Sequence, residues 1–158
     1  MRKKEYVYGT STENIYEVMQ KWDNRFMNLA GQVATWSKDP SKQVGAVIVD
    51  DKRRVIGLGY NGFPRGVKDS PMRYGDRNEK YPRVVHAELN AILNALGSVE
   101  DCTLYATFPP CCECAKAIIQ SGIRRIVMNW SVPSTNWQES IITANNMFQE
   151  AGIEVFSL

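Results

Sequence analysis

Three of the four cysteines fall within four consecutive positions, as Cys111, Cys112 and Cys114, directly after two prolines and at the start of an apolar run. Cys111 and Cys114 are three residues apart, so on a helix their side chains share one face and can bind one cation. Cys112 is rotated by about 100° around such a helix, so we expect a packing residue or a free thiol there. Cys102 precedes an apolar strand pattern and is expected in the core.

The only histidine, His86, begins the triplet His86, Ala87, Glu88 at the start of an expected helix. Zinc accepts thiolate sulfur and imidazole nitrogen, and a site with three protein ligands leaves its fourth position for water. Glu88 is placed to exchange protons with that water without binding the metal itself. A closed structural zinc site is the alternative, although such a site needs no neighbouring carboxylate.

Length and composition place these residues in an ordinary globular domain. The chain has 158 residues, of which 44% are hydrophobic, with a net charge of +2. We therefore expect one domain over residues 1–158, with residues 1–15 as a flexible or docking arm. The nearly balanced charge argues against a nucleic-acid polymer as partner. No secretory signal and no apolar stretch of membrane-spanning length is visible, which predicts a cytoplasmic protein without disulfides or membrane contact.

The first half of the chain predicts a helix, a hairpin and a long connection. Apolar residues recur at helical spacing from Trp22 until the sequence SKDP. Two β-branched runs, at 44–50 and 55–61, predict antiparallel strands joined by a short polar loop. Residues 62–83 are rich in Gly, Pro, Asp and Arg without periodicity, which predicts an irregular functional or mobile loop.

The second half alternates between helix and strand. Helices are expected over 84–96, 111–122 and 138–150, and strands over 102–108, 124–130 and 153–158. This order implies parallel pairing with right-handed crossovers, so the fold class is α/β with a mixed sheet. The partial positive charge at two of these helix starts also favours deprotonated thiols.

The pattern H-x-E followed by P-C-x-x-C resembles the signature of zinc-dependent nucleobase deaminases. Longer segments are similar to the deoxycytidylate (dCMP) deaminase family: SKDPSKQVGAVIVD at 37–50, GYNGFPRGVKDS at 59–70, KYPRVVHAELNAI at 80–92 and CAKAIIQSGIRRIV at 114–127. The resemblance implies a cytidine deaminase-like α/β/α fold, three layers around a five-stranded mixed sheet. It implies one catalytic Zn²⁺ and hydrolysis of dCMP to dUMP and ammonia in pyrimidine nucleotide metabolism. It also implies a homo-oligomer, hexamer or dimer, that dCTP and dTTP regulate.

Carried over by position, the resemblance makes His86, Cys111 and Cys114 the zinc ligands and Glu88 the proton shuttle. Asn61 matches a position that contacts the sugar and base in related deaminases. Its alternative role is that of a turn residue, because Asn-Gly is a strong turn signal.

Further substrate contacts are expected from the backbone and from basic side chains. The backbone at Ala87 and around Pro110 is expected to read the pyrimidine edge, because helix starts offer unpaired amides. A nucleotide substrate also needs a cation for its phosphate, and Lys38, Lys42 and Arg65 are the candidates.

Two stretches depart from the family pattern. Pro109 stands where phenylalanine commonly precedes the Pro-Cys pair, and residues 129–140 lack an Asp-Lys-Tyr-like segment. We therefore expect the wall of the substrate pocket to differ at Pro109. The departure at 129–140 bears on how the substrate phosphate is bound and on regulation by triphosphates. Two alternatives stay open: a deaminase of CMP, cytidine or modified dCMP, and a catalytically silent, zinc-stabilised binding module.

Overall fold

The computed structural model describes residues 14–158, so the arm expected at the N-terminus lies almost wholly outside the described residues. The described chain forms one five-stranded sheet in the order β2-β1-β3-β4-β5. β1 is antiparallel to β2 and β3, whereas β3, β4 and β5 run parallel, which confirms the predicted mixed sheet. The strands are β1 Gly45–Val49, β2 Val55–Tyr60, β3 Thr103–Ala106, β4 Arg125–Met128 and β5 Glu154–Ser157.

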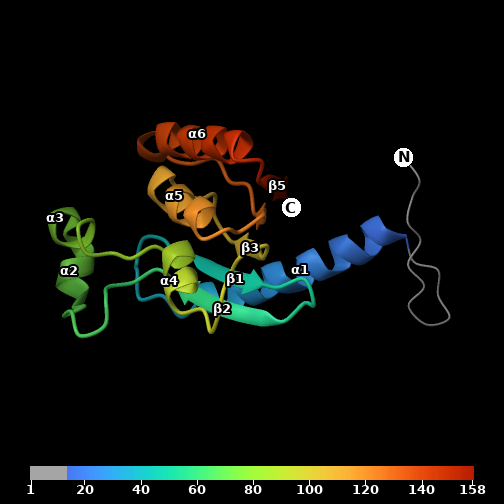
Figure 1. Ribbon diagram of the computed structural model, residues 1–158. Helices are drawn as coiled ribbons and strands as arrows, with labels where there is room; N and C mark the ends of the chain where they lie inside the picture. The colour runs from blue at the N-terminus through green and yellow to red at the C-terminus, as the bar shows by residue number, and fades with distance from the viewer. Residues whose placement is uncertain (1–13) are drawn as a thin grey trace.

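Helices cover both faces of the sheet, giving the three layers that the resemblance implies (Figure 1). One face carries the long helix α1, and the other carries α4, α5 and α6. The bounds are α1 Ile15–Ala34, α4 Ala87–Leu93, α5 Cys112–Gln120 and α6 Thr135–Glu150. None of the helices in residues 14–158 has the length and apolarity needed to cross a membrane.

Strand β1 shows how the sequence builds the two cores. Val47 and Val49 pack with α1, while Ala46 and Ile48 belong to the cluster formed with α4, α5 and α6. Successive side chains of a strand point to opposite faces, so a strand covered on both sides is apolar throughout. All five residues of β1 are buried, which places this strand at the centre of the molecule.

The predicted irregular loop at 62–83 was wrong in part, because two short helices lie within it. These are α2, Pro71–Gly75, and α3, Arg77–Lys80. Side chains of Ser70 and Asp76 cap their starts by accepting backbone N–H groups. Helices of five and four residues span too few turns to produce an apolar period, so only the caps could have indicated them.

Two long helices begin earlier than their apolar patterns do. α1 starts at Ile15 rather than near Trp22, with Asn14 accepting a hydrogen bond from the Tyr16 backbone N–H. α6 starts at Thr135 rather than near Gln138. The first turns of both helices are largely exposed, so their few apolar residues do not extend the buried face of the helix.

A buried ion pair joins α1 to the sheet. The carboxylate of Asp23 accepts two hydrogen bonds from the Arg125 guanidinium, at 2.8 and 2.6 Å, and a third from the Tyr105 hydroxyl at 2.7 Å. Burial and the adjacent carboxylate raise the pKa of Tyr105. Because Arg125 is buried with a single carboxylate to neutralise it, Asp23 is essential to this packing.

We expect Asp23→Ala to lower the free energy of unfolding of the zinc-loaded protein by about 3–5 kcal/mol, because it leaves a buried guanidinium unpaired. The matched control is Glu113→Ala, which removes the exposed ion pair with Lys116 and should cost less than about 1 kcal/mol. Urea denaturation measures both values. Equal, small losses in the two variants would show that the Asp23 pair contributes little.

Candidate active site

His86 is held at the start of α4 by the backbone around it. It occupies the N-cap position in an extended conformation, and its side chain makes no capping bond, so the imidazole is free for another partner. The preceding residue, Val85, exchanges two backbone hydrogen bonds with Gly62, at 2.8 and 3.1 Å. The end of β2 thereby fixes where α4 begins.

Close packing of α4 on β2 depends on small residues in the strand. A Cβ atom at Gly57 would lie 2.6 Å from the carbonyl oxygen of Ala91, and one at Gly59 would overlap the carbonyl oxygen of Ala87. Only glycine therefore lets the helix backbone approach this closely. Asn90 adds a hydrogen bond of 2.8 Å from its side-chain amide to the carbonyl of Tyr60.

Cys111 holds the corresponding position at the start of α5. It is the N-cap residue, extended, and makes no side-chain capping bond. Upstream, Thr107 is tied to Gly45 by two hydrogen bonds of 3.0 Å. Two prolines, Pro109 and Pro110, then carry the chain to Cys111 with restricted backbone angles. The strand end therefore delivers this thiol to a defined place.

The two helix starts bring His86, Cys111 and Cys114 together. The Nδ1 atom of His86 lies 3.3 Å from the Cys111 sulfur and 3.4 Å from the Cys114 sulfur, and all three donor atoms lie within 4.8 Å of one another. In a tetrahedral zinc site with ordinary bond lengths, sulfur and nitrogen ligands are about 3.5 Å apart. The donor types and their spacing therefore fit a zinc ion.

The three groups also share protons. A hydrogen bond from the Cys114 thiol and the nearby imidazole lower the pKa of Cys111 to about 4. The Cys111 sulfur, burial and Glu88 raise the pKa of Cys114. The Cys111 sulfur raises the pKa of His86 against the opposing effect of burial. The shared hydrogen bond and the imidazole thus favour an ionised sulfur in this pair, which is the form that a metal ligand must have.

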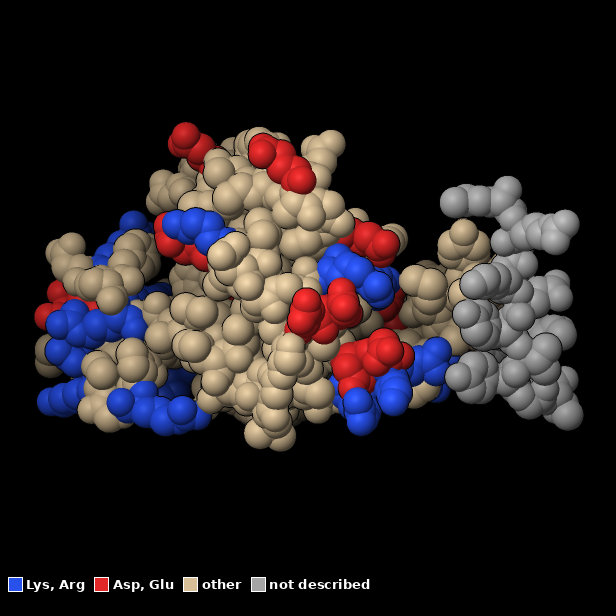
Figure 2. Space-filling view, viewed as in Figure 1, with Lys and Arg blue, Asp and Glu red and all other residues tan. Residues whose placement is uncertain are grey.

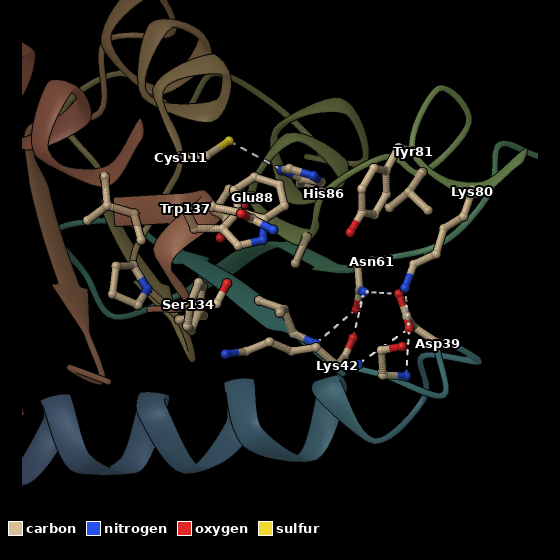
Figure 3. A pocket seen from close by; sticks show the side chains of 18 residues that line it. Asp39, Lys42, Asn61, Lys80, Tyr81, His86, Glu88, Cys111, Ser134 and Trp137 are labelled. Carbon is tan, nitrogen blue, oxygen red and sulfur yellow. Dashed lines mark hydrogen bonds and ion pairs between the residues drawn. The ribbon is translucent and has the colours of Figure 1, made fainter. Parts of the chain in front are cut away.

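Glu88 lies in the first turn of α4 and is only 4% exposed. Burial raises the pKa of its carboxyl group, while the His86 charge and hydrogen bonds from its own backbone N–H and from the Cys114 thiol oppose that rise. Figure 3 shows Glu88 beside His86 and Cys111 in the same pocket. The carboxyl therefore sits next to the donor triad in a water-poor environment.

A cavity of about 570 Å³ opens in front of this group. Its size falls within the usual range for small-molecule sites, about 300–1,000 Å³. The lining residues come from the 39–44 loop, the residue after β2, the end of α3 and the segment that follows it, the start of α4, the segment before α5, and the start of α6 with the residue before it. They are Asp39, Ser41, Lys42, Val44, Asn61, Lys80, Tyr81, Val84, His86, Ala87, Glu88, Phe108, Pro109, Cys111, Ser134, Asn136, Trp137 and Ile141.

The expected substrate contacts divide into those at the cavity and those elsewhere. Lys42, Asn61 and Ala87 line the cavity, whereas Pro110 is fully buried and its neighbour Pro109 is the proline that lines the wall.

The other two candidate cations are not brought to the cavity. Lys38 forms a salt bridge of 2.8 Å with Asp69, and Arg65 donates a hydrogen bond of 2.7 Å to the side chain of Asn94. Neither lines the cavity, which leaves Lys42 as the one of the three that does.

Asn61 uses its side chain to hold the loop that carries Lys42 (Figure 3). Its amide oxygen accepts from the Val44 backbone N–H at 2.8 Å, and its amide nitrogen donates to the Lys42 carbonyl at 2.9 Å and to Asp39 at 3.4 Å. In the structure, the Asn61 side-chain amide thus stabilises the conformation of residues 39–44. Whether it also contacts a sugar stays a prediction.

Several lining residues were missed by sequence reasoning. Lys80 of α3 forms a buried ion pair of 2.8 Å with Asp39, and Tyr81 follows it along the cavity wall. Their positions depend on how the 62–83 segment folds back, for which the sequence carries no periodic signal. Trp137 packs edge-on against His86, with ring centroids 5.9 Å apart. Trp137 lies in residues 129–140, where the sequence differs from the family pattern, and that difference was the only sequence feature that could have drawn attention to it.

Comparison with known proteins identifies the fold family. Residues 20–130 match the model of the cytidine and deoxycytidylate deaminase zinc-binding region. The chain belongs to the cytidine and deoxycytidylate deaminase family. An uncharacterized deaminase of Aliivibrio fischeri, encoded in the luxG 3′ region, is 42% identical over 140 residues, covering 87% of this chain and 94% of that protein. Deoxycytidylate deaminase of Mus musculus is 42% identical over 139 residues, covering 84% and 77%.

A solved structure shows the same fold. The dCMP deaminase of cyanophage S-TIM5, crystallised with dCMP and dUMP, superposes with a TM-score of 0.70 at 24% identity, covering 90% of this chain and 97% of that one. The expected cytidine deaminase-like architecture is therefore confirmed. Zinc is the cofactor of this deaminase family, and the donor triad is the group of described residues that fits it.

We expect Cys114→Ser to lose zinc, because the hydroxyl is a poor replacement for a thiolate ligand. Cys112→Ser is the matched control, since Cys112 is outside the donor triad and its backbone N–H instead donates to Ser140. Elemental analysis of the purified proteins should find about one zinc per chain in the control and far less in Cys114→Ser. The reverse order would refute this choice of ligands.

Proposed function

We propose that this protein hydrolyses dCMP to dUMP and ammonia. Curated deoxycytidylate deaminases from mouse and human are 42% and 46% identical over 139 and 113 residues, respectively. The observation that carries the proposal is the meeting of three donor side chains that fit zinc, a buried carboxyl and a lysine with no carboxylate partner among the described residues, all around one cavity. The first two provide hydrolysis, and the third suits an anionic substrate.

His86, Cys111 and Cys114 would hold the metal in this proposal. When bound there, zinc supplies a Lewis acid that lowers the pKa of water from about 15.7 to about 7. The three residues contribute two sulfurs and one imidazole nitrogen, which leaves one tetrahedral position for solvent or substrate. This open position separates a hydrolytic site from a structural one.

Glu88 would move both protons of the attacking water. Its carboxylate takes one proton and gives it to the ring nitrogen beside the amino-bearing carbon, which makes that carbon more electrophilic. The water oxygen bonds to this carbon. Glu88 then delivers the second proton to the amine, the carbon–nitrogen bond breaks, and ammonia leaves a carbonyl behind. The burial of Glu88 supports this role, because bulk water cannot compete for its proton.

The backbone around the helix starts would orient the pyrimidine. Ala87 is the first residue of α4, so its N–H has no acceptor within the helix, and the residue lines the cavity. Asn61 and Pro110 would act indirectly, Asn61 through the loop that it holds and Pro110 by supporting the Pro109 wall. Ring and sugar contacts are thus assigned to rigid elements rather than to mobile side chains.

Lys42 would bind the 5′-phosphate. The other lysine of the cavity, Lys80, is neutralised by Asp39, whereas the described residues place no carboxylate in a salt bridge with Lys42. Lys38 and Arg65 have polar partners outside the cavity and are not needed for this role.

The direct test supplies the zinc-loaded protein with dCMP, CMP, deoxycytidine and 5-methyl-dCMP and measures ammonia release. We expect dCMP to have the highest kcat/KM. Preference for another member of the panel would redirect the proposal to that cytosine compound. Absence of ammonia from all four would favour the silent binding module.

We expect Glu88→Gln to keep its zinc, with kcat for dCMP lowered by about 100- to 10,000-fold, because the amide cannot accept and return a proton. Steady-state rates with dCMP and zinc content are measured on the same sample. Glu113→Gln, an exposed change on α5, is the control and should retain normal rates. Full activity in Glu88→Gln would refute the proton-transfer role.

We also propose that residues 1–158 form one deaminase domain acting in the cytoplasm as a homo-oligomer, with dCTP and dTTP as effectors. The continuous sheet supports one domain, and large exposed apolar side chains support self-association. The most exposed are Leu96 at 94%, Met72 at 85% and Val132 at 83%. Light scattering tests the assembly, and rates with added dCTP or dTTP test regulation.

Charge distribution agrees with a small substrate. On the face shown in Figure 2, Lys and Arg side chains gather over α2 and α3, while acids and bases mix elsewhere. That face therefore presents no continuous basic track of the kind a polynucleotide requires.

A further inference from the structure

The ammonium of Lys42 lies directly over an aromatic ring at the cavity wall. Its Nζ atom is 3.2 Å from the centroid of the Phe108 ring, and both residues line the cavity. The negative face of an aromatic ring attracts a cation at this distance. The ring covers one side of the ammonium, so the N–H donors on its other sides stay available to an anion.

Both partners of this pair are fixed by their backbones. The N–H of Lys42 donates to Asp39 at 3.3 Å, and its carbonyl accepts from Asn61 at 2.9 Å. On the other side, Phe108 stands between Thr107, which is tied to Gly45, and two consecutive prolines. In Figure 3 the Lys42 side chain runs along the lower edge of the cavity.

We propose that Phe108 is a positioning residue that determines specificity for a 5′-monophosphate over the uncharged nucleoside. A lysine stem is flexible, and its freedom is lost when it binds a ligand. The ring holds the ammonium in place beforehand, so phosphate binding costs less. The inference rests on the proposed function, since it assigns Lys42 to the phosphate of that substrate.

The same segment also relates this cation to the reaction centre. Phe108 and Cys111 are separated only by Pro109 and Pro110. The ring under Lys42, which we call the cation platform, and a metal-ligand candidate therefore belong to one short, stiff segment. The two proline backbones therefore restrict the separation between the Phe108 ring and the Cys111 thiol. A nucleoside, which lacks the phosphate, cannot use this platform.

The test measures binding and does not depend on turnover. Calorimetry gives the dissociation constants of dUMP and deoxyuridine for the zinc-loaded protein. We expect Phe108→Leu to weaken dUMP by about 5- to 10-fold and to leave deoxyuridine within about twofold. Phe108→Tyr keeps the aromatic face and should retain the wild-type preference. In the kinetic counterpart, Phe108→Leu should raise KM for dCMP with kcat nearly unchanged.

Two further variants separate positioning from general packing. Lys42→Met should remove the preference for dUMP, and adding Phe108→Leu to it should weaken dUMP no further, because the two residues act together. Phe156→Leu is the matched control, since it removes the cation–π partner of Arg125 far along the sheet, on β5. It should change neither dissociation constant.

Other outcomes overturn the inference. Equal weakening of dUMP and deoxyuridine by Phe108→Leu, or additive effects in the double variant, would make Phe108 a packing residue. Equal affinities of the wild-type protein for dUMP and deoxyuridine would also overturn the inference, even if the protein deaminates dCMP. By contrast, absent ammonia release together with the expected binding pattern would refute the proposed function and support the cation platform.

Discussion

The site depends on the meeting of two helix starts, those of α4 and α5. Each starts with an N-cap residue whose side chain makes no capping bond, and these two residues are His86 and Cys111. The side chain of an N-cap residue normally accepts a hydrogen bond from a backbone N–H of its helix. Because His86 and Cys111 make no such bond, their side chains can bind a metal instead. Gly57 and Gly59 let α4 sit close enough to the sheet for the two starts to converge.

The cavity separates the reaction chemistry from substrate holding. The donor triad and Glu88 form its reactive end, with Trp137 packed against the imidazole. The 39–44 loop forms the other part, where the Asn61 side chain and the Asp39–Lys80 ion pair hold the backbone. In this arrangement the Asn61 side chain orders the 39–44 loop, a role that the turn signal of the Asn-Gly pair does not predict. The rigid elements thus define both parts before any substrate binds.

Local patterns were sufficient to predict the sheet and the chemical groups. The five strands, the mixed pairing and the approach of His86, Cys111 and Cys114 follow from periodicity, turn residues and ligand spacing. Contacts made by folded-back segments were not predictable. Lys80 reaches Asp39 from a segment 41 residues away, and the choice of Lys42 over Lys38 and Arg65 depends on tertiary partners. The Phe108 ring under Lys42 follows β3, far along the chain from Lys42, and no sequence pattern predicts that the two residues meet.

The central claim is that zinc is held by two sulfurs and one imidazole, with one position open. Zinc K-edge X-ray absorption on the metal-loaded protein tests this most directly. It should show two sulfur neighbours at about 2.3 Å and two nitrogen or oxygen neighbours at about 2.0–2.1 Å. A third or fourth sulfur in that shell would mean that further cysteines close the site, and it would contradict the account.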